Sequence, residues 1–170
     1  YTFDLKIESF YGLFGYFNLS KNFLSFFSVF VFVFIMNSYN LVDGVDGLAT
    51  SIGVFINLFF SFIFYLNDCY FDFYLSIILL TCLASFFYFN KPPAKIFMGD
   101  SGSLFIGLII AYFSLRACNL PIDSSGTINP VFIVCILAYP SVDTLRVFIV
   151  RILNGKSPFT ADRNHIHHLL

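Results

Sequence analysis

Five long apolar segments alternate with short polar breaks along the chain. Each segment is about as long as the run of roughly 17 to 25 apolar residues that a helix needs to cross a bilayer. The breaks contain Asn, Asp, Gly and Pro, which interrupt helices. The pattern therefore predicts transmembrane helices at 20–36, 48–66, 72–89, 102–119 and 130–150. The predicted fold class is an all-α polytopic integral membrane protein, with residues 1–170 forming part of a single membrane domain.

Residues 1–19 precede the first span and follow a different pattern. Phe3, Leu5 and Ile7 alternate with charged residues, which is typical of a strand with one apolar face. A short external hairpin is expected there. No signal-peptide pattern follows Tyr1, so we expect the chain to be an interior piece of a longer protein.

The orientation of the spans follows from the placement of basic residues. Successive spans alternate in direction, so the breaks 37–47, 90–101 and 151–170 share one side of the membrane. That side carries the larger number of basic residues, namely Lys91, Lys95, Arg151, Lys156 and Arg163 against Lys6, Lys21 and Arg116. By the positive-inside rule, these three breaks are predicted to be cytoplasmic loops.

The composition supports a membrane protein and argues against other classes. Hydrophobic residues make up 58% of the chain and charged residues 11%, which is too apolar for a soluble domain or a disordered tail. Nine basic and ten acidic residues give a net charge of −1. Because nucleic-acid binding requires a clustered excess of Lys and Arg, no nucleic-acid partner is expected. The lipid bilayer is the expected partner, and a homodimer is left open.

The first cytoplasmic break carries four hydrogen-bonding residues at every third position: Asn37, Asn40, Asp43 and Asp46. This spacing places them along one side of a helical turn. A plain polar turn would also use Asn, Asp and Gly. Carboxylates at the edge of a hydrocarbon layer are costly, however, and are usually retained for a task. We therefore favour a functional role.

The second break contains Asp100 in the sequence Gly-Asp-Ser-Gly, directly before the fourth span. In the plain interpretation, Asp100 or Ser101 caps the helix that follows. In the functional interpretation, the free amides of that helix N-terminus face phosphate oxygens, and the carboxylate holds a divalent cation that bridges them.

The third break holds all three histidines of the chain, His165, His167 and His168, next to Arg163. A zinc site would need further ligands, and only one carboxylate, Asp162, is near in the sequence. Contacts to phosphate or nucleotide are preferred, with Arg163 as a bidentate partner. A solvated loop without special function is the alternative.

The fifth span contains two features of its own. Asp143 and Arg146 are three residues apart, so they can pair on one face of a helix, either structurally or in support of a site. Pro140 is expected to kink that helix.

Carboxylates, a cation site, a helix N-terminus and a His/Arg loop at one membrane face suit phosphoryl transfer between a nucleotide-bound donor and a lipid. A diphosphate resists attack by an anionic nucleophile until cations screen its oxygens. Mg²⁺ held by an aspartate, with Mn²⁺ as an alternative, would supply that screening.

Three segments carry a specific resemblance: NSYNLVDGVDGL at 37–48, KIFMGDSGSLFIG at 95–107 and GKSPFTADRNHIHHLL at 155–170. In this order they resemble the signature segments of the polyprenyl-phosphate N-acetylhexosamine-1-phosphate transferases, glycosyltransferase family 4. The His-Ile-His-His form of the last segment is similar to the branch that makes undecaprenyl-diphospho-N-acetylglucosamine. The resemblance implies transfer of N-acetylhexosamine 1-phosphate from a UDP-sugar to undecaprenyl phosphate with release of UMP, and N-acetylglucosamine is the expected sugar.

The resemblance also implies a location and a set of site residues. It implies an Mg²⁺-dependent, multi-pass enzyme of the bacterial inner membrane whose active site faces the cytoplasm and which initiates synthesis of O-antigen, common antigen or teichoic acid. The family's metal-binding aspartate matches Asp100. Its catalytic residues match Asp43, Asp46 and His165. Its substrate-binding residues match Asn40, Arg163, His167 and His168.

The sequence departs from the family in one respect, because it contains no adjacent pair of aspartates. The family carries such a pair, credited with activating the lipid phosphate, on its N-terminal helices. The chain is therefore expected to lack those helices and the family's C-terminal helices, and to be inactive by itself. Two other function classes stay open: a catalytically silent relative that serves as an assembly partner, and a transporter. The transporter is disfavoured because the polar clusters lie at one face and not near the midplane.

Overall fold

The computed structural model describes Ile7 and residues 20–123, 126–127 and 130–153. Within these residues four long helices form a bundle: α1 (Lys21–Val42), α2 (Leu48–Leu66), α3 (Tyr70–Asn90) and α4 (Gly99–Cys118). Their 19 to 22 residues cover roughly 28 to 33 Å at about 1.5 Å per residue, which matches the hydrocarbon thickness of a bilayer. All four are long and apolar enough to cross a membrane. The chain is a polytopic membrane protein.

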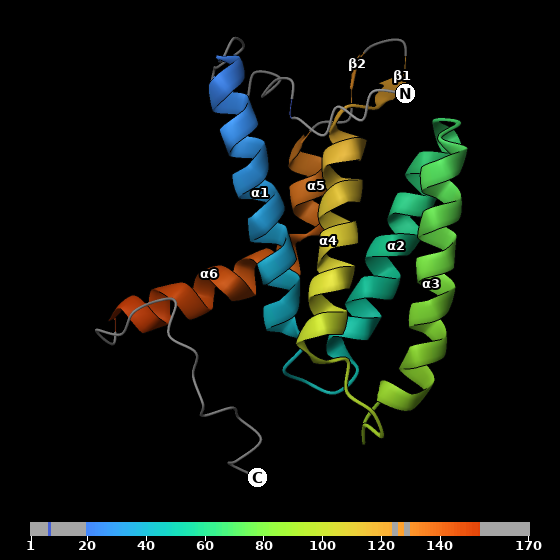
Figure 1. The fold of residues 1–170 in the computed structure, drawn as a ribbon, viewed down its shortest axis with the longest axis vertical. Helices are drawn as coiled ribbons and strands as arrows, with labels where there is room; N and C mark the ends of the chain where they lie inside the picture. The colour runs from blue at the N-terminus through green and yellow to red at the C-terminus, as the bar shows by residue number, and fades with distance from the viewer. Residues whose placement is uncertain (1–6, 8–19, 124–125, 128–129, 154–170) are drawn as a thin grey trace.

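The bundle consists of two helix pairs. α2 packs along α3 and α1 packs along α4, while α4 also contacts α2. The chain reverses direction after each long helix, so the segments 43–47 and 91–98 lie at the same end of the bundle (Figure 1). This is the end that the sequence assigns to the cytoplasm.

The interior of the bundle combines aromatic rings with small residues. Phe60 and Phe64 of α2 pack on Phe113 of α4 with ring centroids 5.7 and 5.2 Å apart, and all three are fully buried. At the α1–α4 contact, a Cβ on Gly107 would lie 2.7 Å from the main-chain oxygen of Met36. Small residues of this kind allow membrane helices to approach closely. Many large apolar side chains on the outer faces are exposed, as suits surfaces that contact lipid.

The end of the bundle opposite to the segments 43–47 and 91–98 is held by a buried carboxylate. Asp72 of α3 is 4% exposed and accepts hydrogen bonds from Tyr112 Oη at 2.7 Å and Arg116 Nε at 3.2 Å, both on α4. Two short antiparallel strands, β1 (Pro121–Asp123) and β2 (Gly126–Thr127), lie at this same end (Figure 1). The buried charge is paired, as burial in an apolar bundle requires.

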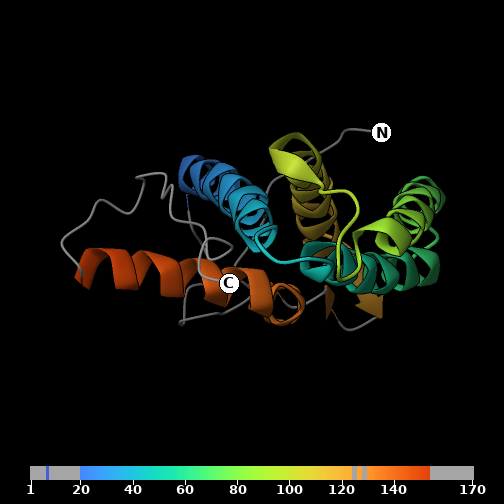
Figure 2. The same ribbon diagram turned by 90° about the horizontal axis from the view of Figure 1, so that it is seen from below.

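The prediction of one continuous helix over 130–150 is wrong. The chain forms α5 (Pro130–Ile136), a turn at Leu137 and α6 (Ala138–Leu153). Pro140 explains the break, because it has no N–H for the carbonyl four residues earlier and its ring crowds that carbonyl. α6 runs across the bundle beside α1 (Figures 1 and 2). Among the described residues, four helices and not five are therefore long enough to span a membrane.

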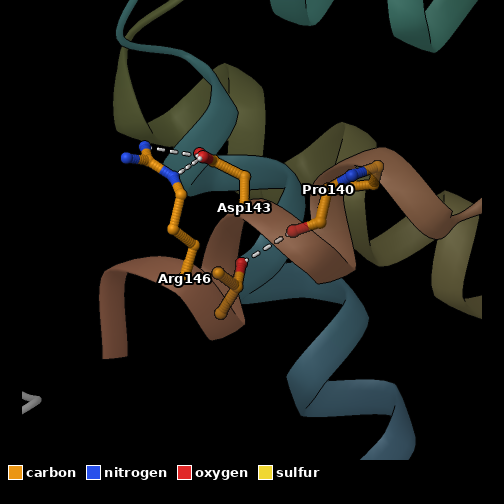
Figure 3. Close-up of polar contacts among 4 residues, drawn as sticks. Pro140, Asp143 and Arg146 are labelled. Atoms are coloured by element: carbon orange, nitrogen blue, oxygen red, sulfur yellow. Dashed lines mark hydrogen bonds and ion pairs between the residues drawn. The ribbon is translucent and has the colours of Figure 1, made fainter. Parts of the chain in front are cut away.

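α6 carries the ion pair that the spacing predicts. Arg146 donates from Nη2 and Nε to Asp143 Oδ1 at 2.9 and 3.1 Å (Figure 3). The buried Thr144 hydroxyl donates to the Pro140 carbonyl at 2.9 Å. The Arg146 side chain is 67% exposed and that of Asp143 29%, so the pair is not buried among the described helices.

Two other expectations concern the ends of the first span. α1 continues to Val42 and not only to residue 36, so Asn37 and Asn40 lie in its last turns and not in a loop. The expected hairpin in 1–19 lies outside the described residues apart from Ile7, whose N–H donates to Ser28 Oγ at 2.8 Å.

A methyl group at position 107 should force α1 away from α4. The substitution Gly107→Ala places a Cβ against the Met36 backbone, which cannot turn aside as a flexible side chain can. Overpacking costs about 1–3 kcal/mol, so we expect a lower midpoint of thermal unfolding for the detergent-solubilised protein. Gly44→Ala is the matched control, because no atom lies within 4 Å of a Cβ there. Equal midpoints for the two variants would contradict the close packing of α1 on α4.

Candidate active site

The first two polar clusters of the sequence meet where α1 ends and α4 begins. Asn40, in the last turn of α1, donates from Nδ2 to Ser103 Oγ of α4 at 2.7 Å, although the two are 63 residues apart. Ser103 is fully buried, and its hydroxyl lies 3.0 Å from the Gly99 carbonyl oxygen and 3.3 Å from that of Asp100. These contacts fix the first turn of α4 against the end of α1.

Asp43, which follows the last turn of α1, lies beside the N-terminus of α4. The N-cap residue of α4, Met98, provides no side-chain hydrogen bond. The Asp43 carboxylate instead lies near the Gly99 N–H, which lowers the pKa of the carboxyl. A negative charge is favoured at this position by the unpaired amides and the partial positive charge of a helix N-terminus. Because α4 begins at Gly99, Asp100 and Ser101 lie within its first turn, and the interpretation in which one of them is the N-cap is wrong.

The surroundings of Asp43 suit a cation. Partial burial raises the pKa of its carboxyl to about 6; the hydrogen bond from Gly99 opposes this rise and the negative charge of Asp100 adds to it. Two carboxylates that repel each other are stabilised by a cation between them. Mg²⁺ is commonly held by one or two carboxylates together with water and substrate phosphates. The exposed Asp100 leaves room for those further ligands, and the pair fits such an ion.

No larger acidic or histidine cluster is present in the part of the chain that the structure describes. There, no group of three or more His, Cys, Asp or Glu residues lies close enough together to hold a metal ion. A cation at Asp43 and Asp100 would therefore take its remaining ligands from water, from substrate or from outside this part of the chain.

Asp46 makes a different contact from Asp43. Its Oδ2 accepts a hydrogen bond at 2.9 Å from the N–H of Ala94, in the segment 91–98 between α3 and α4. The next residue, Gly47, has a φ of +73°, in the left-handed region that favours glycine. A Cβ on Gly47 would lie 3.2 to 3.4 Å from atoms of Phe87, Pro92 and Lys91. The segment 91–98 thus lies directly against the start of α2.

Two buried residues that the sequence analysis did not select also hold the segment 91–98. Thr50 Oγ1 donates to Asn90 Oδ1 at 2.6 Å, and Asn90 Nδ2 donates to the Ile96 carbonyl at 3.0 Å. Thr50 and Asn90 are 0% and 3% exposed. In the sequence, only its position could have pointed to Thr50, because it is a polar residue four positions after Asp46 within an apolar span.

The structure brings together those predicted site residues that it describes. Asn40, Asp43, Asp46 and Asp100 all lie at one end of the bundle. Asn37 shares their sequence spacing but donates to the Val33 carbonyl of its own helix at 2.7 Å. The remaining predicted residues lie outside the described residues: Asp162, Arg163, His165, His167 and His168.

Known proteins share this sequence pattern. Residues 1–118 match the family model of glycosyl transferase family 4. A probable undecaprenyl-phosphate N-acetylglucosaminyl 1-phosphate transferase from Bacillus subtilis (strain 168) is 39% identical over 137 residues, which are 80% of this chain and 37% of that protein. A decaprenyl-phosphate N-acetylglucosaminephosphotransferase from Mycolicibacterium smegmatis is 36% identical over 156 residues, covering 81% of this chain and 38% of that protein.

A third relative carries a different name. A phospho-N-acetylmuramoyl-pentapeptide-transferase from Caldanaerobacter subterraneus is 37% identical over 147 residues, covering 86% of this chain and 44% of that protein. The chain spans less than half the length of each of these three relatives.

Loss of the Ser103 hydroxyl should weaken the connection between α1 and α4 at the site. Ser103→Ala removes the acceptor of the Asn40 Nδ2 hydrogen bond, and an unpaired, partly buried donor costs about 1–3 kcal/mol. We expect a lower midpoint of thermal unfolding in detergent. Ser101→Ala is the control, because Ser101 is exposed on the same turn and should change stability by less than about 0.5 kcal/mol. Equal midpoints of thermal unfolding for Ser103→Ala and Ser101→Ala would show that the hydrogen bond from Asn40 to Ser103 does not stabilise the site.

Proposed function

Because this chain belongs to glycosyl transferase family 4, we propose that its protein transfers N-acetylhexosamine 1-phosphate from a UDP-sugar to a polyprenyl phosphate and releases UMP. The observation that carries the proposal is that the end of α1, with Asn40 and Asp43, lies against the first turn of α4, with Asp100, and is joined to it by the hydrogen bond from Asn40 to Ser103. N-acetylglucosamine is the proposed sugar and undecaprenyl phosphate the proposed acceptor. Two of the relatives support this choice, since their names contain a polyprenyl phosphate and N-acetylglucosamine.

The proposed reaction is governed by charge. An oxygen of the lipid phosphate forms a bond to the sugar-bearing phosphorus of the donor, and the bond from that phosphorus to the bridging oxygen breaks, so that UMP leaves. Nucleophile, donor and leaving group are all anions, and catalysis consists mostly of positioning and of neutralising their charge. Mg²⁺, or alternatively Mn²⁺, would screen the diphosphate oxygens while bound to Asp43 and Asp100.

Residues of this chain would position the reacting groups. Asp43 orders the first turn of α4 through the Gly99 N–H, and Asn40 holds the same turn through Ser103. We further propose that His165 has a catalytic role and that a second group binds the donor's phosphates and sugar. That group consists of Arg163, His167 and His168.

The proposal includes a location. The site would face the cytoplasm at the bacterial inner membrane, and the product would initiate O-antigen, common-antigen or teichoic acid synthesis. Lys91 and Lys95 support this orientation, since both are exposed in the segment 91–98 at the end where Asp43 and Asp100 lie.

The two alternative functions have less support. A transporter would use Asp143 and Arg146 to line a pathway, yet these residues pair with each other and are not buried among the described helices. A silent assembly partner would not need two repelling carboxylates beside a helix N-terminus, where Asp43 and Asp100 lie.

Release of UMP tests the proposed function. We expect the complete gene product in membranes to release UMP from UDP-N-acetylglucosamine only when undecaprenyl phosphate and Mg²⁺ are both present. Asp100→Asn should lower the rate about a hundredfold or more, because it removes a charge that acts on the transition state. Asp68→Asn is the matched control: Asp68 is exposed at the opposite end and has a φ of 54°, which Asn tolerates. Asp72 is not a suitable control, because it is buried against Tyr112 and Arg116.

The other outcomes of this assay are equally informative. Equal rates for the Asp100 and Asp68 variants would contradict the role of Asp100. Release from another UDP-sugar only would retain the reaction and change the sugar. An absence of release with every donor would contradict the enzyme and favour the assembly partner.

A further inference from the structure

We propose that Asp46 and Thr50 are positioning residues that hold the segment 91–98 and thereby fix the position of Asp100 at the start of α4. This inference rests on the proposed function. It gives Asp46 a role different from the catalytic role that the resemblance implies, and it gives a role to Thr50, which the sequence analysis did not select. Asp46 directly precedes Gly47, the N-cap residue of α2, and Thr50 lies in the first turn of that helix.

Asp46 supplies the hydrogen-bond acceptor for a backbone N–H of the segment. Ala94 follows Pro92 and Pro93, which have no N–H. Backbone donors away from water need a partner, and regular secondary structure provides none within the segment. The Asp46 carboxylate accepts from the Ala94 N–H at 2.9 Å, across 48 residues of sequence. One of its two oxygens is therefore used to hold the backbone of the segment.

Thr50 holds the second half of the same segment through Asn90. The Thr50 hydroxyl is fully buried and donates to Asn90 Oδ1 at 2.6 Å. This bond orients the Asn90 amide so that its Nδ2 donates to the Ile96 carbonyl at 3.0 Å. The Lys95 N–H donates to the Phe89 carbonyl at 2.9 Å. The start of α2 and the end of α3 thus fix the segment at consecutive positions.

These contacts determine where α4 begins. Ile96 lies three residues before Gly99, whose N–H meets Asp43, and four residues before Asp100. Over so few residues a shift of the Ile96 backbone is transmitted to Asp100. A displacement of about 1 Å in a catalytic group can lower a rate about a hundredfold. Loosening the segment should therefore reduce turnover, although neither Asp46 nor Thr50 touches a reacting atom in this scheme.

The substitutions Asp46→Asn and Asp46→Ala distinguish a catalytic role of Asp46 from a positioning role. Asn keeps an oxygen that can accept from the Ala94 N–H but carries no charge, whereas Ala provides neither. A residue that binds metal or moves a proton needs the charge, so Asn would fail as Ala does. A positioning residue needs only the acceptor, so Asn would largely replace it.

Kinetics of the complete gene product, measured as UMP release, test this difference. We expect Asp46→Asn to keep kcat within about fivefold of wild type, and Asp46→Ala and Thr50→Val to lose about tenfold or more in kcat with little change in the KM for the UDP-sugar. Thr50→Ser keeps the hydroxyl and should restore the rate, which separates a lost hydrogen bond from a protein that fails to fold. Asp43→Asn is the comparison, with a loss of about a hundredfold.

Amide hydrogen exchange gives a readout that is independent of activity. In the stretch 91–95 only Lys91, Ala94 and Lys95 carry amides, so the signal of Ala94 can be resolved. Its amide should be protected in the wild type and in Asp46→Asn, and should exchange faster in Asp46→Ala. If Asp46→Asn is as inactive as Asp43→Asn, or if exchange at Ala94 is unchanged in Asp46→Ala, the proposal is wrong. If the wild type releases no UMP, the proposed function fails, and the exchange result alone decides whether Asp46 holds the segment.

Discussion

The close approach of α1 and α4 decides where the charged residues of the site lie. Gly107 lets the two backbones meet near Met36, and one turn closer to the site Asn40 bonds to Ser103. Beyond that bond, Asp43 meets the first amide of α4. The negative charge of Asp100 repels that of Asp43. The packing of Gly107 on Met36 and the hydrogen bond from Asn40 to Ser103 must offset this repulsion. Two repelling carboxylates kept together in this way would be stabilised by a bound cation, in line with the proposed Mg²⁺ site.

The two aspartates of the first cluster have separate partners. Asp43 contacts the helix that carries Asp100, while Asp46 contacts the segment that leads into that helix. The start of α4 is thus held by α1 on one side and by the start of α2 on the other. At the opposite end, the buried Asp72 joins α3 to α4 through Tyr112 and Arg116, outside the proposed chemistry.

Sequence patterns predicted the parts of this structure that depend on composition and spacing. Long apolar runs predicted the four spanning helices, and the alternation of their directions predicted that Asp43 and Asp100 share one end. Contacts between distant residues could not be read in the same way: Asn40–Ser103 and Thr50–Asn90 join positions 63 and 40 residues apart. Hydropathy also gave no sign that α1 continues past residue 36, because polar side chains in a last helical turn remain satisfied at the membrane surface.

In the proposed site, Asp43 at the end of α1 and Asp100 at the start of α4 together hold one divalent cation. Binding of Mn²⁺ to the complete gene product, followed by electron paramagnetic resonance in the absence of substrate, tests it most directly. Asn at position 43 keeps the size of the side chain and an acceptor oxygen, so this substitution removes the charge with little change in packing. The account predicts that Asp43→Asn and Asp100→Asn each weaken Mn²⁺ binding about tenfold or more, while Asp68→Asn binds as the wild type does. Unchanged Mn²⁺ affinity in the Asp43 variant would contradict a shared site.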